Sequence, residues 1–219
     1  TPLGAGVAGV AEVAFSACGG YLIAAHAGEG FSVWQCDDWT CRKWSTNGRE
    51  VTALAWGTVQ SKHGDAPVAL VATAGTTKLS AVHLSPRDSI TEIAAHVLPP
   101  ERPMMTTEGG GGADADDDEC GIVYMDWDAS SSRLALALVG GARDGSVAVY
   151  ATRTSNIVSG SLIGHFDTRD ENTGARVPAC ALTISTPKPA SRGSLRAHLA
   201  VAFDNGDIAR VPLTYANPK

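Results

Sequence analysis

The sequence has 219 residues, of which 44% are hydrophobic and 18% charged, a composition typical of a globular domain with a sizeable core. No apolar run approaches the roughly 18 residues that a membrane-spanning helix needs, which argues against an integral membrane protein. The net charge of −6 argues against a broad electrostatic contact with nucleic acid, because such a contact needs a basic face. The chain begins Thr1-Pro2-Leu3, without Met or a charged leader, and we expect a piece of a longer protein.

The cysteines and the glycosylation signals bear on the cellular compartment. The chain has 5 cysteines, an odd number, and Cys36 and Cys41 are the only close pair. No second pair and no nearby His completes a tetrahedral zinc site around them. The sequence also contains no N-x-S/T acceptor for glycosylation. We therefore predict a reduced protein that faces the cytosol.

Helical periodicity is nearly absent, and short segments rich in Val, Ala and Leu recur between turn-forming residues. These segments predict four groups of strands. The first three groups hold four segments each, at 11–16, 21–25, 31–35 and 39–45, at 51–56, 68–74, 78–84 and 91–98, and at 122–128, 133–139, 146–152 and 157–163. The fourth group holds segments 177–185, 197–203 and 207–213. Asp144-Gly145 and Asn205-Gly206 favour tight hairpins, because these dipeptides readily adopt positive φ.

Self-similarity between the groups predicts the architecture. The groups recur about every 40 to 50 residues. Val13–Ser16, Leu54–Gly57 and Met125–Asp128 each end an apolar run with an aromatic residue and a small or polar turn residue. Units of four strands at this period are typical of the blades of a β-propeller. A β-sandwich is the main alternative, although its strands need not repeat in fours. We predict an all-β propeller with blades at about 10–50, 51–98, 122–166 and 177–215.

Three stretches interrupt the pattern. Residues 99–121 combine two prolines, a run of glycines and the acidic run from Asp114 to Glu119, and such a composition cannot bury enough apolar surface to order itself. We expect a disordered loop there rather than a calcium site, because the run lacks the spaced ligands and the glycine of a calcium-binding loop. We expect a smaller polar insertion at 61–67 and a charged loop at 165–176.

No known catalytic motif is present in the sequence. The G-x-S-x-G elbow, the H-E-x-x-H metal motif and the G-x-x-x-x-G-K-[ST] phosphate loop are all absent. A propeller hydrolase would cluster carboxylates, His or metal ligands on the first strands of its blades. Glu12 and Asp126 are the only acidic residues in the segments that we predict as first strands. The sequence therefore predicts no enzyme, and no catalytic, cofactor-binding or metal-binding residue.

Trp34, Trp39 and Trp44 form the densest aromatic cluster of the chain. Trp39 and Trp44 differ by five positions, so on an extended strand their side chains face opposite sides. We expect one to pack between sheets and the other to face outward, where an exposed Trp is a candidate anchor for a protein partner. Packing of that outward-facing Trp against a neighbouring blade or loop is the alternative. Trp39 and Trp44 are the candidate interface residues.

The segment from Phe31 to Trp44, F-S-V-W-Q-C-D-D-W-T-C-R-K-W, resembles the aladin family of WD-repeat nucleoporins, which share the pattern W-T-C-x-x-W. The chain departs from the general WD pattern, because Gln35 follows Trp34 and no repeat keeps an intact WD dipeptide. The similarity runs along nearly the whole chain and is poor at about 58–67, 99–121 and 164–176. Further family-like motifs follow in the same order, at Met125–Asp128 with Arg133–Leu136, at Tyr150–Thr154 and at Gly206–Tyr215.

The resemblance implies a WD40-type propeller in a non-enzymatic, structural nucleoporin that supports nucleocytoplasmic transport, including transport of protein and mRNA. It implies other nucleoporins as partners, especially a transmembrane nucleoporin of the pore membrane. Membrane association would then occur only through that partner, without direct contact with nucleic acid and without a cofactor. The implied location is the nuclear envelope, with an association with the mitotic spindle. A generic WD40 adaptor in trafficking or ubiquitin-ligase assemblies is the alternative.

The strand count also predicts an incomplete ring. The segments make three full four-stranded blades and a three-stranded last blade, whereas propellers close with roughly four to eight blades of four strands. We expect the C-terminal part of a roughly seven-bladed ring, with an apolar flank on its first blade and an unpaired strand edge on its last.

Overall fold

The computed structural model describes residues 9–28, 30–61, 64–84, 91–97, 120–141, 144–154, 158–190 and 194–215, and gives only the backbone for 61 and 91–97. Within these ranges every long regular element is a β-strand, and none is an α-helix. The first two sheets contain β1 (Val10–Phe15), β2 (Tyr21–His26), β3 (Phe31–Gln35), β4 (Cys41–Trp44), β5 (Val51–Ser61), β6 (Gly64–Thr73), β7 (Lys78–His83) and β8 (Thr91–Val97). The later strands are β9 (Gly121–Trp127), β10 (Arg133–Val139), β11 (Val147–Arg153), β12 (Ser159–Phe166), β13 (Thr168–Arg169), β14 (Arg176–Val177), β15 (Ala179–Ile184), β16 (Lys188–Pro189), β17 (Leu195–Phe203) and β18 (Ile208–Tyr215).

The first three sheets are antiparallel meanders in which each strand pairs with the next along the chain. Their orders are β1-β2-β3-β4, β5-β6-β7-β8 and β9-β10-β11-β12. The fourth sheet has the order β15-β17-β18, and the short β16 pairs with the start of β17. Since β18 pairs along the whole of β17, β15 and β16 share its other edge. Pro187 and Pro189 interrupt that edge because proline has no N–H for the ladder.

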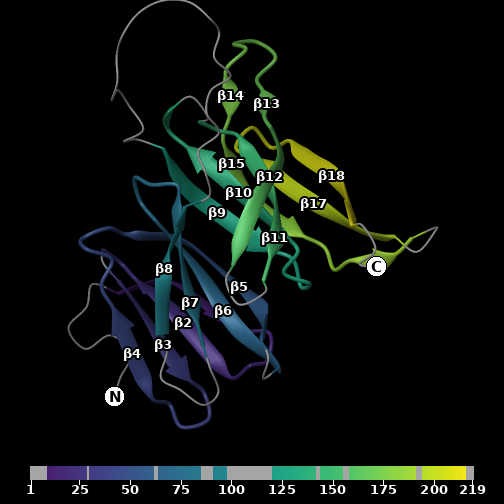
Figure 1. The fold of residues 1–219 in the computed structure, drawn as a ribbon. Helices are drawn as coiled ribbons and strands as arrows, with labels where there is room; N and C mark the ends of the chain where they lie inside the picture. Colours follow the sequence, from purple (N-terminus) through teal and green to yellow (C-terminus); the bar gives the residue numbers. More distant parts are fainter. Residues whose placement is uncertain are drawn as a thin grey trace, which may run out of the picture.

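The four sheets follow one another in chain order, with their first strands side by side. β1 contacts β5, β5 contacts β9, and β9 contacts β15. Figure 1 shows the first two sheets in purple to blue and the other two in teal to yellow. This arrangement confirms the all-β, propeller-type prediction. The boundaries of the blades and the seven-bladed ring stay predictions.

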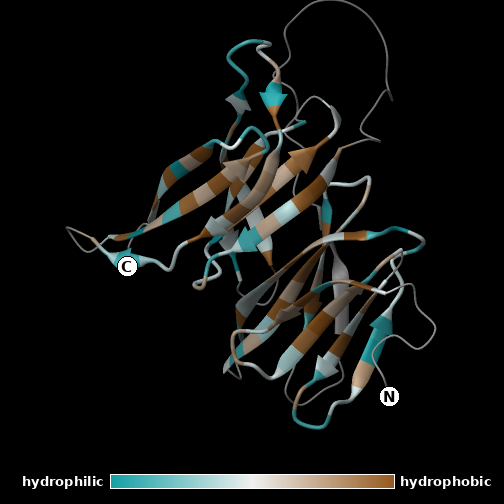
Figure 2. Cartoon of the chain, turned by 180° about the vertical axis from the view of Figure 1, so that it is seen from behind, coloured by the Kyte–Doolittle hydropathy of each residue, from teal (hydrophilic) through white to brown (hydrophobic). Residues whose placement is uncertain are grey.

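Three clusters of buried apolar side chains fill the spaces between consecutive sheets, and Figure 2 shows the hydrophobic stretches along the strands that supply them. Between the second and third sheets, large side chains from both faces pack together, with alanines of the second sheet among them. The large ones include Leu70 and Leu79 of the second sheet and Trp127, Leu134, Leu136 and Tyr150 of the third, and the alanines are Ala53, Ala55, Ala72 and Ala81. Full burial of each large apolar side chain contributes about 1.5–3 kcal/mol, so these contacts hold the sheets together.

Two of the three predicted interruptions are partly regular structure, which corrects the sequence analysis. At 61–67, the hairpin of β5 and β6 continues to the pair Ser61↔Gly64, and Val59 is buried beside it. At 165–176, β12 runs on to Phe166 and a ribbon of β13 and β14 follows. In both strand pairs, the backbone hydrogen bonds between the strands satisfy polar sequence as well as apolar sequence. The predicted disordered loop falls outside the described residues, apart from Cys120 and from Gly121, which begins β9.

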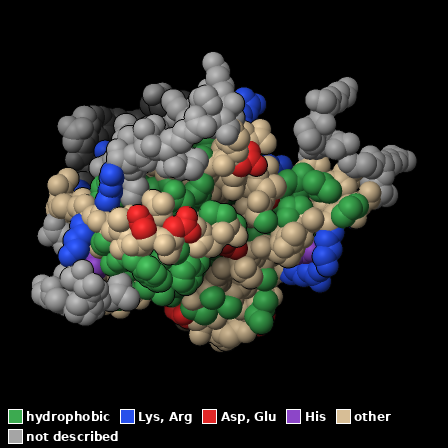
Figure 3. Space-filling model, turned by 90° about the horizontal axis from the view of Figure 1, so that it is seen from below, with side chains coloured by type: hydrophobic (Ala, Val, Ile, Leu, Met, Phe, Trp, Pro, Cys, Tyr) green, Lys and Arg blue, Asp and Glu red, His purple; other side chains and the backbone are tan. Residues whose placement is uncertain are grey.

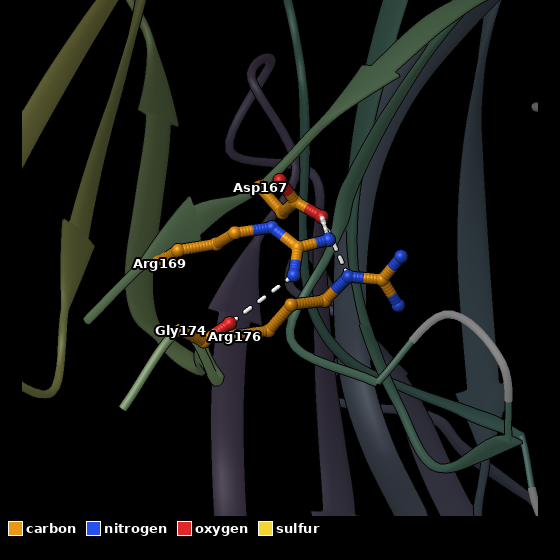
Figure 4. Close-up of polar contacts among 4 residues, drawn as sticks. All are labelled: Asp167, Arg169, Gly174 and Arg176. Atoms are coloured by element: carbon orange, nitrogen blue, oxygen red, sulfur yellow. Dashed lines mark hydrogen bonds and ion pairs between the residues drawn. The ribbon is translucent and has the colours of Figure 1, made fainter. Parts of the chain in front are cut away.

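Charged side chains stabilise the ribbon of β13 and β14. Arg176 Nε donates to Asp167 Oδ2 at 2.5 Å, and Arg169 Nη2 lies 3.7 Å from the same oxygen. Arg169 Nη1 also donates to the carbonyl oxygen of Gly174 at 3.1 Å (Figure 4). In the turn, Asp170 Oδ1 accepts from the backbone N–H of Thr173 at 2.8 Å. Three of the charges that favoured a loop, on Asp167, Arg169 and Arg176, therefore pair in or beside the ribbon.

Candidate functional site

Trp39 is an exposed aromatic side chain at the turn between β3 and β4. Its side chain is 61% exposed, and its backbone has a φ of 56°, which is unusual for a bulky residue. Asp38 Oδ1 fixes the turn by accepting from both the backbone N–H and the hydroxyl of Thr40, at 3.0 and 2.8 Å. The backbone N–H of Gln35 donates to the carbonyl oxygen of Thr40 at 2.9 Å. These bonds hold a large apolar surface toward solvent.

Trp44 is directed inward. Its ring stacks on Phe31 with a centroid separation of 5.3 Å and an interplanar angle of 7°, and it packs against the core between the first two sheets. The structure thus has one tryptophan packed and the other exposed. However, β4 begins at Cys41, so Trp39 lies in the turn and not on a strand. The exposure of Trp39 comes from the geometry of the turn. It does not come from the alternation of side chains between the two faces of a strand, on which the prediction was based.

Polar and acidic groups surround the Trp39 turn. The two hydrogen bonds from Thr40 lower the pKa of Asp38, which keeps this carboxylate ionised. Burial, followed by the charge of Asp37 and the nearby Cys18, raises the pKa of the Cys36 thiol and keeps it protonated. Asp37, Asp38 and Trp39 therefore form a surface with an aromatic ring and negative charge. Such a surface can contact a partner.

The two acids of the first strands have separate surroundings. Asp126 Oδ2 accepts from the backbone N–H of Ile184 at 2.6 Å and from the hydroxyl of Thr183 at 3.1 Å, which ties β9 to β15. Burial raises the pKa of Asp126, although these hydrogen bonds oppose the shift. Burial also raises the pKa of Glu12, which lines a small pocket of about 130 Å³ with Thr52 and others. Among the described residues, no group of three or more His, Cys, Asp and Glu is arranged to hold a metal ion.

A hydrogen-bond network in the third sheet was not apparent from the sequence. Trp127 Nε1 donates to the Thr152 hydroxyl at 2.9 Å, and that hydroxyl donates to the Ser131 carbonyl at 2.7 Å. The Ser131 hydroxyl in turn accepts from the backbone N–H of Thr58 in the second sheet, at 2.7 Å. Since 21 residues separate Ser131 from Thr152, no local motif could have revealed the connection.

The same turn also joins the third sheet to the fourth. Asp128 Oδ1 accepts from the backbone N–H groups of Ser132 and Arg133, at 2.7 and 2.9 Å. The Arg133 guanidinium lies 4.7 Å from the centre of the Tyr215 ring and donates to the Thr214 carbonyl at 3.2 Å. Burial and the neighbouring Asp128 raise the pKa of Tyr215. This region therefore connects three consecutive sheets, which is a structural role.

Comparison with solved structures finds proteins of low sequence identity. A gluconolactonase of Pseudomonas aeruginosa is 12% identical, with a TM-score of 0.48 over 95% of this chain and 57% of its own. A chain of the mitotic checkpoint complex is 12% identical, with a TM-score of 0.45 over 93% of this chain and 67% of its own. A Lactobacillus plantarum protein is 15% identical, with a TM-score of 0.44 over 93% and 70%. No protein-family model matches the sequence.

Comparison with curated proteins finds a relative at higher identity. Aladin of Arabidopsis thaliana is 30% identical over an alignment of 190 residues, and the alignment covers 84% of this chain. The chain spans 37% of the length of that relative. The match agrees with the resemblance carried by the Phe31–Trp44 segment and by the motifs that follow it. The chain is therefore an aladin-like, WD-repeat sequence.

Proposed function

We propose that this chain is part of a structural, non-enzymatic nucleoporin, which acts as an interaction platform of the nuclear pore complex and supports nucleocytoplasmic transport of protein and mRNA. The observation that carries the proposal is the 30% identity to Arabidopsis aladin over 84% of the chain. The structural role of Asp126, which bonds β15 of the neighbouring sheet, is consistent with it. Binding residues commonly lie on turns and loops that a rigid scaffold of packed sheets holds in position.

The partners that we propose are other nucleoporins, especially a transmembrane nucleoporin of the pore membrane. No helix in the described part of the chain is long and apolar enough to cross a membrane. We propose attachment to the nuclear envelope through that partner, and association with the spindle during mitosis. Direct contact with nucleic acid does not enter the proposal, because the net charge is −6.

Within this proposal, Trp39 is the anchor that inserts into the partner. Rigid, exposed tryptophans dominate binding energies at protein interfaces because they bury a large area at a low entropic cost. Trp44 does not contribute directly, since it is committed to the stack with Phe31. Its role is to fix β4 and, with it, the turn that presents Trp39.

Imaging of the tagged full-length protein, combined with proximity labelling, tests the proposal. We expect a punctate nuclear rim and labelling of a transmembrane nucleoporin. Trp39→Ala should weaken that labelling by about tenfold or more, as expected for loss of a central anchor. Ile163→Ala is the matched control, because Ile163 is also large, apolar and 55% exposed but lies on β12. A uniform cytosolic signal with labelling of trafficking or ubiquitin-ligase components would favour the generic adaptor instead.

A further inference from the structure

Two cysteines from separate turns lie at the same end of the first sheet. Cys18 is in the turn between β1 and β2, and it is exposed. Cys36 directly follows β3, at the start of the turn that presents Trp39, and it is half-buried. Both thiols are free. Figure 3 views the molecule from below, toward the end of the sheet where β3 turns into β4, and shows apolar and acidic side chains side by side at the surface.

Gly20 connects the two cysteine positions. The backbone N–H of Cys36 donates to the carbonyl oxygen of Gly20 at 2.8 Å. This bond extends the register of β2 and β3 by one pair beyond Tyr21↔Gln35. Side chains directly opposite each other in an antiparallel pair share a face, with Cβ atoms about 4.5–5.5 Å apart. A side chain at position 20 would therefore be the direct neighbour of the Cys36 side chain.

The Cys18 sulfur lies beside the space that such a side chain would fill. A Cβ added to Gly20 would lie 3.5 Å from Cys18 Sγ and would meet no other atom within 4 Å outside its chain neighbours. The two thiols therefore lie close together, with no side chain on Gly20 to separate them. Electrostatics agree, because Cys18 contributes, after burial and the charge of Asp37, to the raised pKa of the Cys36 thiol. Gly19 and Gly20 also let the turn adjust to the geometry of a disulfide.

Cys41 is the other cysteine of this region, and its surroundings differ. Its Sγ donates to the carbonyl oxygen of Arg42 at 3.8 Å, on its own strand. Trp34 is its partner across β3 and β4, so its direct neighbour on the sheet is an indole and not a thiol. Cys41 is therefore a suitable control for the pair formed by Cys18 and Cys36.

We propose that Cys18 and Cys36 form a reversible disulfide when the protein meets a disulfide oxidant such as oxidised glutathione. Cys18 reacts first, because it is exposed and its sulfur lies 3.3 Å from the Ser16 hydroxyl, which can donate to the thiolate. The Cys18 thiolate attacks one sulfur of the oxidant, and the other sulfur leaves as a thiolate. Cys36 then gives up its proton to solvent, attacks the Cys18 sulfur of the mixed disulfide and releases the second thiolate. The two protein thiols lose two protons and two electrons, and the oxidant becomes two thiols.

The disulfide joins the β1–β2 turn to the first residue of the turn that presents Trp39. In a reducing compartment such bonds are transient and respond to oxidants. The oxidised protein therefore holds the Trp39 turn at one more point than the reduced protein. An effect on partner binding rests on the role proposed above for Trp39, whereas the disulfide itself does not.

Peptide mapping of the full-length protein tests the proposal. The reduced protein is equilibrated with oxidised glutathione under native conditions, and the remaining thiols are blocked by alkylation. Cleavage after Glu29 and before Asp37 then places Cys18, Cys36 and Cys41 on three separate peptides. We expect the Cys18 and Cys36 peptides as one linked species, two hydrogen atoms lighter than their sum, which reduction separates.

Three single substitutions complete the test. Cys18→Ser and Cys36→Ser should each abolish the linked species, and Cys36→Ser should also retain glutathione on Cys18, because the second attack is then missing. Cys41→Ser is the matched control, since it removes another exposed thiol of the same region and should leave the linked species unchanged. A bond between Cys36 and Cys41, a link that the control also loses, or an original protein in which Cys18 and Cys36 stay unlinked would each overturn the proposal.

Discussion

The ring of Trp127 lies directly on Gly57, so closely that a Cβ added to Gly57 would come within 2.3 Å of the ring. Trp127 belongs to β9 and Gly57 to β5, the first strands of consecutive sheets. The indole is only 4% exposed, and its Nε1 is bonded to Thr152. Absence of a side chain in one sheet therefore allows the close approach of an aromatic side chain from the next.

Gly57→Ala is expected to destabilise the protein by about 1–3 kcal/mol, because overpacking of a core contact forces side chains or backbone to move. Gly164→Ala is the matched control, since its added Cβ meets nothing within 4 Å and its backbone needs no positive φ. Urea unfolding followed by circular dichroism measures both. Equal stabilities for the two variants would show that Trp127 relaxes without cost.

The bond between Trp127 and Thr152 is expected to contribute about 0.5–1.5 kcal/mol, as a typical buried hydrogen bond does. Trp127→Phe and Thr152→Val should each destabilise by more than this, because each also changes packing and leaves a polar group unpaired. The double variant isolates the pairwise contribution. A coupling energy of zero in this cycle would argue that the network does not join the strands energetically.

Asp126 is expected to make stability fall as the pH rises. Because burial raises its pKa in the folded state above the ordinary value of 3.8, the folded protein holds this proton more tightly than the unfolded chain. The resulting stabilisation is present in acid and is lost as the pH rises from about 4 through the higher folded-state pKa. Asp126→Asn should remove this component from the pH dependence measured by urea unfolding.

Asp170→Asn serves as the control of opposite sign. The hydrogen bonds from Thr173 lower the pKa of Asp170, so its contribution is present above the ordinary value of 3.8 and is lost as the pH falls. The difference in free energy of unfolding between each variant and the original protein, plotted against pH, should therefore slope in opposite directions for the two variants across the acidic range. A difference in free energy of unfolding that does not change with pH for Asp126→Asn would contradict the raised folded-state pKa of Asp126.

Deletion of Thr106–Glu119 is expected to change stability little. This prediction concerns residues outside the described ranges and rests on their composition, since glycines and like charges have little apolar surface to bury. Loop closure also costs little per added residue, so shortening the loop gains or loses only about 1 kcal/mol. Thermal unfolding measures the effect, and calcium titration of the original protein should show no binding at micromolar levels.

The sequence by itself determined where most strands lie. Arg133–Val139 was predicted with the bounds that the structure has, because its apolar side chains and the turns beside it are local signals. The Asn205-Gly206 hairpin likewise follows from the freedom of glycine, and Gly206 has a φ of 88°. Repetition of such segments in fours was sufficient to identify sheets stacked in chain order.

Only the tertiary structure decided which side chains meet. The Trp127 contact joins residues far apart in the sequence, and nothing local to Gly57 indicates that an indole will cover it. Trp39 is exposed because Asp38 and Thr40 bend the chain before β4 begins, whereas strand alternation alone could not have placed it. Strand position depends on local side-chain patterns, but contacts between sheets depend on the shapes of faces that only the assembled fold brings together.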